Sequence, residues 1–118
     1  MSAARLRRSS DIDAVRTEGR TLREAAFSSR SRPNDLAVVR LTVSAPRTLG
    51  GAVIRNRARR RIREAFRFAL SETGPFRGVD MVVTARREAL SLDFSALRSS
   101  AASVLRAASV LRAAGEAG

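Results

Sequence analysis

The chain has 118 residues, of which 44% are hydrophobic, and a formal net charge of +12; this length predicts a single domain with a modest core. Cysteine and histidine are both absent, which excludes disulfide bonds, the usual zinc sites and catalytic triads built on histidine. All 23 basic residues are arginines, whose planar donor fork matches phosphate groups, so the charge favours a nucleic-acid partner.

The N-terminal residues predict a basic arm and a short helix. Residues 1–9 contain several arginines and lack the apolar stretch of a signal peptide, so we expect a flexible basic arm. Ser10, which two aspartates follow, has the side chain of a helix N-cap, and Gly19 suits a helix end. These signals predict a helix near 11–18.

Three segments predict strands. Residues 36–44 are rich in β-branched side chains, residues 79–86 ("VDMVVTAR") have the clearest strand pattern, and residues 23–31 have a weak one. The alternation within 36–44 divides its side chains between the two faces of a sheet. One face carries Ala37, Val39, Leu41 and Val43, and the other carries Val38, Arg40, Thr42 and Ser44.

An arginine-rich segment, "RNRARRRIREAFR", precedes the last predicted strand. We interpret it as part of a helix from about Gly51 to Ser71, and Gly74 and Pro75 are suited to end that helix. At helical spacing its side chains divide into an apolar face and a cationic face. The apolar face comprises Ile54, Ala58, Ile62, Ala65, Phe66 and Ala69; the cationic face comprises Asn56, Arg59, Arg60, Arg63 and Arg67, with Arg55, Arg57 and Arg61 at its flanks.

The C-terminal segment predicts a last helix, which Ser91 is suited to cap. Its apolar residues recur at helical spacing and are Phe94, Leu97, Ala101, Val104, Leu105 and Ala108. The repeat "AASVLR" occurs at 101–106 and again at 107–112. The second copy points about 120° away from the first on a helix, so it cannot extend the same buried stripe. We expect the end of this helix to be exposed, frayed or packed against a neighbour.

The order helix, two or three strands, helix, strand, helix predicts an α+β fold. We expect a single-domain α–β sandwich over 10–113, with a sheet of about four strands and three helices, and a disordered tail over 114–118. No apolar run approaches the roughly 18 residues of a membrane span, so we expect a cytoplasmic protein that does not bind a membrane.

The run of like charge on the arginine-rich helix needs a partner outside the chain. Like charges four residues apart repel on a helix, and solvated structural faces usually mix both signs. Membrane-surface binding is disfavoured because the apolar face has small residues and is needed for the core. The amide of Asn56 suits a 2′-hydroxyl or a base edge, and Gly50 and Gly51 leave backbone N–H groups open to a phosphate, which favours structured RNA. A high-GC genome explains arginine in place of lysine equally well, but it does not explain the net charge.

The run "AVIRNRARRRIREAFR" resembles the signature helix of the bacterial ribonuclease P protein component. In that family the helix carries an Arg-Asn-Arg core, further basic residues, an Arg-Glu pair and an apolar residue. The segments "DIDAVRTEG", "LTVS", "GGAV" and "MVVTARR" also fit the family pattern, so the likeness spans most of residues 5–110. The matching helix positions are Arg55, Asn56, Arg57, Arg60, Arg61, Arg63 and Glu64.

The resemblance implies a function and a fold. The family's protein is a subunit of the ribonucleoprotein endonuclease that removes the 5′ leader from precursor tRNA, and the RNA subunit carries the active site. We therefore expect no catalytic residue and no metal on the protein alone, Mg²⁺ held mainly by the RNA, and one protein bound to one catalytic RNA. The family fold is an α–β sandwich with a left-handed β-α-β crossover around the arginine helix, opposite to the usual hand.

The resemblance also implies two RNA-binding surfaces. The surface for the catalytic RNA comprises Arg47, Arg55, Asn56, Arg57, Arg59, Arg60, Arg61, Arg63, Arg67, Arg86 and Arg87. The candidates for a cleft that holds the single-stranded leader, between the first helix and the open sheet face, are Ile12, Arg16, Phe27, Arg30 and Arg40. Relatives line this cleft with aromatic residues that stack on bases. Here these aromatics are largely missing, so we expect guanidinium stacking and charge to replace them; a place in the core is an equally good prediction for Phe27, and a solvated strand end is the alternative for Arg86 and Arg87.

Two other functions remain open. A ribosomal or other structural RNA-binding protein would use the same cationic helix without any link to cleavage. A stand-alone nuclease would cut its substrate in a metal-dependent way without an RNA subunit. The Arg-Asn-Arg helix between two β-branched strands favours the ribonuclease P interpretation.

Overall fold

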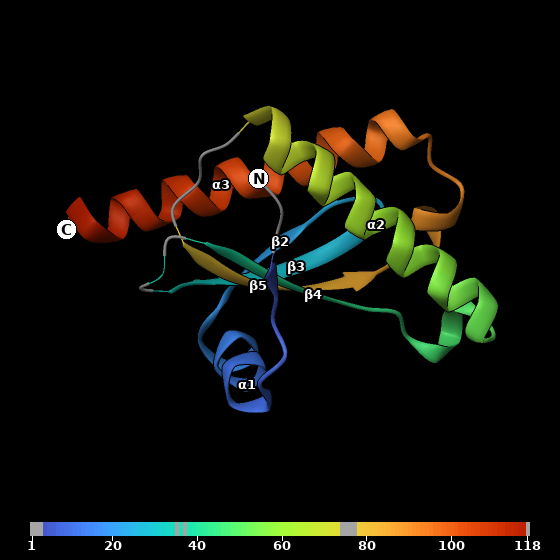
Figure 1. The fold of residues 1–118 in the computed structure, drawn as a ribbon, viewed down its shortest axis with the longest axis horizontal. Helices are drawn as coiled ribbons and strands as arrows, with labels where there is room; N and C mark the ends of the chain where they lie inside the picture. Colours follow the sequence, from blue (N-terminus) through green and yellow to red (C-terminus); the bar gives the residue numbers. More distant parts are fainter. Residues whose placement is uncertain (1–3, 35, 37, 74–77, 118) are drawn as a thin grey trace.

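The structure is a computed structural model that describes residues 4–34, 36, 38–73 and 78–117, the last nine as backbone only. Its elements in chain order are β1 (Ala4–Arg5), α1 (Ser9–Glu18), β2 (Arg20–Arg23), β3 (Phe27–Pro33), β4 (Val39–Ser44), the 3-10 turn η1 (Arg47–Leu49), α2 (Ala52–Thr73), β5 (Val79–Ala85), the 3-10 turn η2 (Arg87–Leu90) and α3 (Phe94–Ala117). The predicted α+β class with three helices is confirmed (Figure 1).

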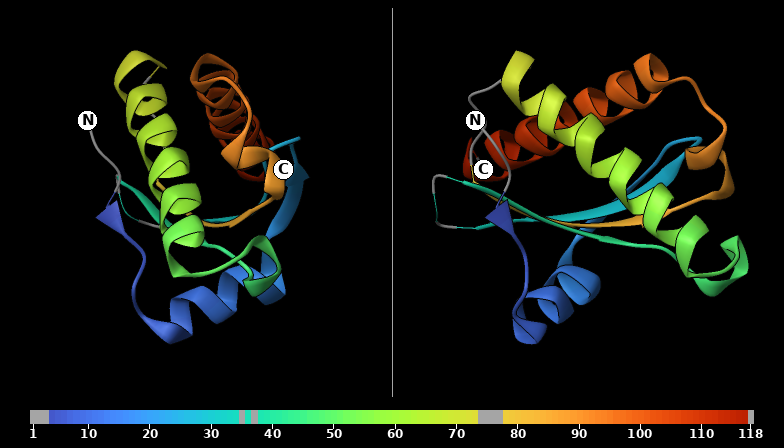
Figure 2. Two further views of the ribbon diagram at one scale, coloured as in Figure 1. Left: turned by 90° about the vertical axis from the view of Figure 1, so that its right-hand side faces the viewer. Right: turned by 45° about the vertical axis from the view of Figure 1, so that its right-hand side comes forward.

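The strands form one mixed sheet of five strands, in the order β1-β4-β5-β3-β2, where about four were predicted. Helices α2 and α3 lie side by side over one face, and α1 lies against the other (Figure 2). Strands β4 and β5 are adjacent and parallel, and α2 connects them. The predicted β-α-β unit is therefore present. The left-handedness of its crossover stays a prediction.

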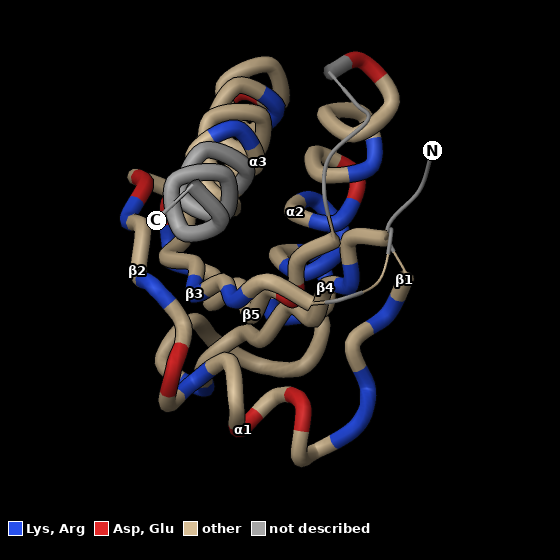
Figure 3. Tube along the Cα trace, turned by 90° about the vertical axis from the view of Figure 1, so that its left-hand side faces the viewer, with Lys and Arg blue, Asp and Glu red and all other residues tan. Residues whose placement is uncertain are grey.

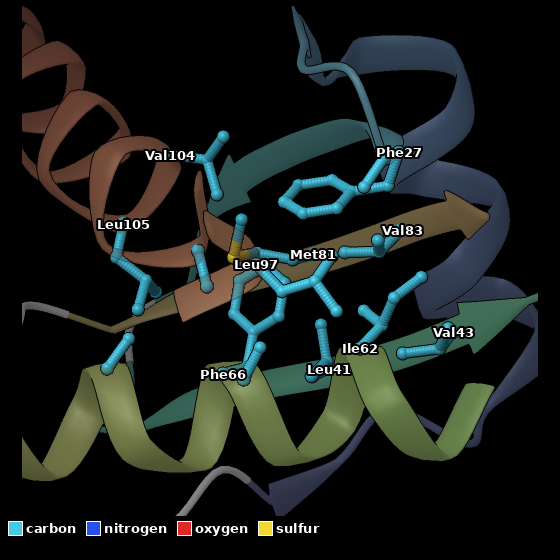
Figure 4. Close-up of a cluster of buried hydrophobic side chains, with 14 of the residues drawn as sticks. Phe27, Leu41, Val43, Ile62, Phe66, Met81, Val83, Leu97, Val104 and Leu105 are labelled. Carbon is cyan, nitrogen blue, oxygen red and sulfur yellow. The ribbon is translucent and has the colours of Figure 1, made fainter. Parts of the chain in front are cut away.

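The main core lies between the sheet and the pair α2 and α3 (Figure 4). Phe27 of β3 packs on Phe66 of α2 with 5.5 Å between ring centroids. The predicted inward residues of β4 are buried where the structure describes them: Val39, Leu41 and Val43. Each such side chain contributes about 1.5–3 kcal/mol relative to exposure, so this layer holds α2 in place and sets which of its faces meets solvent.

A second, smaller apolar cluster holds α1 against the opposite face of the sheet. Val15 of α1 is fully buried against Leu6 and Val82, and Ile12 packs on their edge. Gly19 ends α1 as predicted, for a steric reason: a Cβ there would come within 2.3 Å of the Val15 carbonyl oxygen. The helix end at Gly19 and the chain reversal that follows it thus place α1 across β3 and β5.

Several sequence-based boundaries were wrong. Ser10 does not cap α1, which begins at Ser9 after Arg8, two residues before the predicted start, and Ser91 ends η2 instead of starting α3. The arm predicted over 1–9 contributes β1, and α3 continues through residues 114–117, where a disordered tail was predicted. The predicted helix end at Gly74 and Pro75 and the side chains beyond position 108, which include most of the second "AASVLR" copy, lie outside the described residues.

The predicted apolar face of α2 is confirmed except at its first position. Ala58, Ile62 and Phe66 are fully buried, whereas Ile54 is 43% exposed. Ile54 belongs to the first turn of α2 and lies over Gly50, whose φ of 140° favours glycine and whose missing Cβ leaves room for the Ile54 side chain. The periodicity places Ile54 on the correct side of the helix, but other packed elements do not cover that turn.

Candidate nucleic-acid interface

The cationic face of α2 is turned away from the core. Arg57 and Arg60 are exposed, and within the described residues their guanidinium groups form no hydrogen bond or ion pair. Arg59 donates a hydrogen bond from Nη2 to Asn56 Oδ1 at 2.6 Å, which leaves the amide N–H groups of Asn56 available. This part of the face therefore presents donors and positive charge to solvent.

Arg63 lies deeper and beside other arginines. Its burial, followed by the nearby charges of Arg5 and Arg59, lowers the pKa of Arg63 below its ordinary value. Arg5 comes from β1, which pairs with β4 at the edge of the sheet, so the cluster joins segments far apart in the sequence. A polyanion bound here would relieve the repulsion among the three guanidinium groups.

Arg67 is partly neutralised by its own helix. Its Nη2 lies 2.7 Å from Glu64 Oε2, and its guanidinium carbon lies 4.6 Å from the centroid of the Phe68 ring. The hydrogen bond between the two side chains lowers the pKa of Glu64 and raises that of Arg67. An RNA phosphate would have to compete with Glu64 for this guanidinium group, so Arg67 is a weaker candidate than Arg57 or Arg60.

Two arginines of the predicted RNA-binding set are used inside the fold. Arg61 donates from Nη1 to the Ala89 carbonyl and from Nη2 to the Leu92 carbonyl, each at 2.6 Å. The prediction that Arg61 contacts RNA does not fit this geometry, because its donors hold the turn that leads into α3. Arg55 donates from Nε to the Ala45 carbonyl at 3.0 Å, which ties the start of α2 to the end of β4.

The remaining candidates of this set lie at the ends of strands. Arg47 is exposed on η1, next to the start of α2, whereas Arg86 and Arg87 are exposed after β5. The backbone N–H of Gly50, predicted to be open to a phosphate, instead donates to the Arg47 carbonyl at 3.2 Å. Arg86 lines a hollow on the α1 side of the sheet, so it belongs with the cleft candidates and not with α2.

That hollow is a cleft of about 460 Å³ beside α1 on the open face of the sheet. Among the described residues that line it, all the charged ones are arginines and none carries a carboxylate. The lining consists of Arg16, Thr21, Arg23, Ser28, Arg30, Val82, Thr84 and Arg86. Arg30 donates from Nη2 to the Gly19 carbonyl at 2.9 Å, whereas its Nε is buried and has no hydrogen-bond partner within the described residues. The cleft is therefore suited to an anionic group.

The structure brings together only part of the predicted leader-binding set. Arg16 and Arg30 line the cleft, and Ile12 packs in the apolar cluster beneath α1. Phe27 was a wrong choice because it is fully buried on the opposite face of the sheet, so the alternative of a core aromatic holds. Arg40 was also misplaced, since it lines a separate hollow near the N-terminus of α1.

The sequence analysis missed Arg23, Thr21 and Ser28, which also line the cleft. They belong to the β2–β3 hairpin, where Thr21 pairs with Arg30 and Arg23 with Ser28. Paired residues share a face of the sheet, so the hairpin register carries Arg23 to the same side as α1. The segment "RTLR" is too short for its pattern to predict a strand, and the sequence placed Arg23 at the start of the weak strand 23–31 instead of at the end of β2.

Arg40 and Asp80 form the best-buried ion pair of the described residues. Arg40 donates from Nε and Nη2 to the two carboxylate oxygens of Asp80, each at 2.7 Å, and Asn34 donates to Asp80 Oδ1 at 2.7 Å. A longer ion pair joins Arg40 to Asp11 at 3.5 Å. The hydrogen bond with Asp80 raises the pKa of Arg40, and the network ties the α1 side of β4 to β5.

We expect Asp80→Ala to destabilise the domain by about 2 kcal/mol in urea unfolding. Breaking a buried pair generally costs about 3–5 kcal/mol because one charge stays buried, but the Arg40 side chain is 25% exposed and can turn to Asp11. The double variant Arg40→Ala/Asp80→Ala should lose less than the sum of the two single variants. Additive losses would show that the two side chains do not act as a pair.

Two further properties concern metals and membranes. Within the residues that the structure describes, no three carboxylate, histidine or cysteine side chains gather closely enough to hold a metal ion. None of the described helices combines the length and apolar character needed to cross a membrane.

The family model described as Ribonuclease P matches residues 1–109. The ribonuclease P protein component of Roseiflexus sp. (strain RS-1) is 38% identical over 112 residues, which cover 94% of this chain and 90% of the relative. The component from Streptococcus mutans serotype c is 35% identical over 107 residues, 90% of this chain and 87% of that protein.

The fold is similar to solved structures of the same family. The RNase P protein from Thermotoga maritima has a TM-score of 0.74 and 30% identity, and the match covers 86% of this chain and 94% of that one. The RNase P protein from Staphylococcus aureus has a TM-score of 0.72 and 28% identity, with 91% and 96% covered. Sequence and fold agree, and the chain belongs to the ribonuclease P protein family, the protein components of the tRNA-processing ribonucleoprotein ribonuclease P.

Proposed function

We propose that this chain binds the catalytic RNA of ribonuclease P through the cationic face of α2 and helps that RNA remove the 5′ leader from precursor tRNA. The observation that carries the proposal is the exposure of Arg57 and Arg60, for which the described residues provide no carboxylate partner. Asn56, on the same helix, adds amide donors that suit a 2′-hydroxyl. In this proposal one protein binds one RNA, and the RNA performs the chemistry.

The arginine-lined cleft beside α1 is the proposed site of the single-stranded leader. Arg16, Arg23 and Arg30 provide charge that no carboxylate among the described lining residues opposes. Phe27 lies in the core, so the leader is bound here by guanidinium groups, which attract phosphates and stack on bases. The cleft lies beside α1, and α1 and α2 lie on opposite sides of the sheet (Figure 2), so the protein contacts both RNAs at once.

The proposal predicts that the chain stimulates cleavage of precursor tRNA by a bacterial ribonuclease P RNA at low Mg²⁺. The protein's charge reduces the repulsion between the two RNAs, a task that otherwise needs more Mg²⁺. If about five phosphates are neutralised, the log–log slope of affinity against salt should be roughly −4. Initial cleavage rates across a Mg²⁺ titration, with and without protein, test this.

Three outcomes separate the possible functions. Stimulation at low Mg²⁺ that disappears as Mg²⁺ rises supports the proposal. Tight RNA binding without any stimulation would favour a structural RNA-binding protein. Cleavage by the protein without RNA would revive the stand-alone nuclease.

A further inference from the structure

Three arginines lie on the chain segment that passes around the edge of the sheet from β1 to α1 (Figure 1). Arg5 belongs to β1, and Arg7 and Arg8 follow it; all three are exposed. The segment is held in place by Leu6, whose N–H donates to the Leu41 carbonyl at 3.0 Å and whose side chain is only 3% exposed. The backbone that carries the three arginines is therefore fixed against the edge of the sheet. We call Arg5, Arg7 and Arg8 the edge arginines.

The fold does not neutralise the edge arginines. Within the described residues their guanidinium groups make no hydrogen bond and no ion pair. They line a hollow of about 560 Å³ whose two carboxylates, Asp11 and Asp80, both pair with Arg40. Among the described lining residues the hollow thus has an excess of positive charge, which favours an anionic partner.

The edge arginines continue the cationic face of α2. In the parallel pairing of β1 with β4, Arg5 is opposite Leu41, whose side chain lies on the face covered by α2. Arg5 is near enough to Arg63 for its charge to contribute to the lowered pKa of Arg63. Figure 3 shows basic positions on α2, on β1 and along the segment that leads to α1. The positive charge thus runs from α2 around the open edge of the sheet.

We propose that the edge arginines form a second contact with the backbone of the catalytic RNA, continuous with the contact made by α2. The inference rests on the proposed function, because it takes α2 as the first contact. The cationic face of α2 and the edge arginines together form one arginine strip. An RNA backbone carries a negative charge at every nucleotide, so a single strand of the docked RNA supplies phosphate partners along the whole strip. The strip is continuous with α2, whereas the leader cleft has a different lining that contains none of the edge arginines. The partner is therefore the catalytic RNA and not the leader.

The test compares the double variant Arg5→Gln/Arg7→Gln with a control of equal charge change, Arg20→Gln/Arg106→Gln. The control positions are exposed and lie on β2 and α3, away from the strip. Binding to ribonuclease P RNA is measured without substrate from 50 to 200 mM salt. Each lost phosphate contact lowers the magnitude of the slope of log affinity against log salt concentration by about 1. We therefore expect the magnitude of this slope to be about 2 smaller for the edge variant than for the wild type. Its binding defect should shrink about tenfold across that salt range, while the control stays close to wild type.

The outcomes keep the two proposals apart. A steep wild-type slope that the edge variant retains would overturn the second contact and leave the α2 contact standing. An equal loss in the control would also overturn it, because net charge alone would then explain the effect. A defect that appears only with leader-bearing precursor would assign the edge arginines to the leader and reject this inference. A wild-type protein without salt-dependent RNA binding would overturn both proposals. Thermal unfolding of each variant verifies that the fold is intact.

Discussion

The substitution Ile62→Asp should unfold the domain. Ile62 is fully buried in the middle of α2, where it faces Leu41 and Val43 of the sheet (Figure 4). Truncating such a side chain alone costs about 2–5 kcal/mol, and an aspartate adds the cost of burying a polar or charged group without a partner. The total approaches the stability of about 5–15 kcal/mol that is typical of a small domain. Circular dichroism should show lost helix and no cooperative thermal transition at neutral pH.

Val53→Asp is the matched control for this experiment. Val53 belongs to the same helix and is 83% exposed, so the same aspartate stays in water there. A carboxylate in the first turn also interacts favourably with the helix dipole. We expect the stability of this variant to stay within about 0.5 kcal/mol of wild type. If Ile62→Asp unfolded with the same midpoint as Val53→Asp, the assignment of the buried face of α2 would be wrong.

The double reversal Arg57→Glu/Arg60→Glu should abolish most RNA binding without unfolding the domain. Both side chains are exposed and have no partner in the described part of the chain, so the fold loses no contact. Each reversal removes an attraction to phosphate of up to about 1 kcal/mol and adds a repulsion of similar size. We expect affinity for ribonuclease P RNA to fall roughly 30-fold or more. Filter binding or fluorescence anisotropy at fixed salt measures the loss, and thermal unfolding tests the fold.

The corresponding control is Arg20→Glu/Arg106→Glu, which changes the net charge equally at exposed positions outside α2. General attraction between a basic protein and RNA would weaken both variants alike. A docking face on α2 would weaken the first much more than the second. Equal losses would therefore refute the assignment of α2 while leaving a role for net charge.

Much of the fold could be predicted because the signals were local and repeated. Strands β4 and β5 have several β-branched residues in succession, and the apolar residues of α3 recur over four turns. Strands β1 and β2 have two and four residues, too few for a period to emerge. Both lie at edges of the sheet, where each pairs with one neighbouring strand only. Their existence depends on partners that are distant in the sequence.

The candidate site was likewise predictable where it depends on one helix and not where it combines distant segments. The cationic face of α2 was predicted, since the positions of residues around a helix depend on their order alone. The arginine-lined cleft was not, because its residues come from α1, the β2–β3 hairpin and β5. Phe27 shows the limit most clearly: its residue type fits a stacking platform, but strand register points it into the core.

The sequence by itself determined that α2 has one face for the core and one for solvent, and that the chain as a whole needs an anionic partner. It could not determine which guanidinium groups are available to that partner. Only the tertiary structure decided this, because Arg61 finds its acceptors 28 and 31 residues away while Arg57 and Arg60 find none in the described chain. It also decided that Arg5 lies near Arg63 of α2, since β1 reaches that edge by pairing with a strand more than thirty residues later. Net charge and helical periodicity follow from the residue order. Whether a guanidinium group is available to an anionic partner depends on contacts that exist only after the chain has folded.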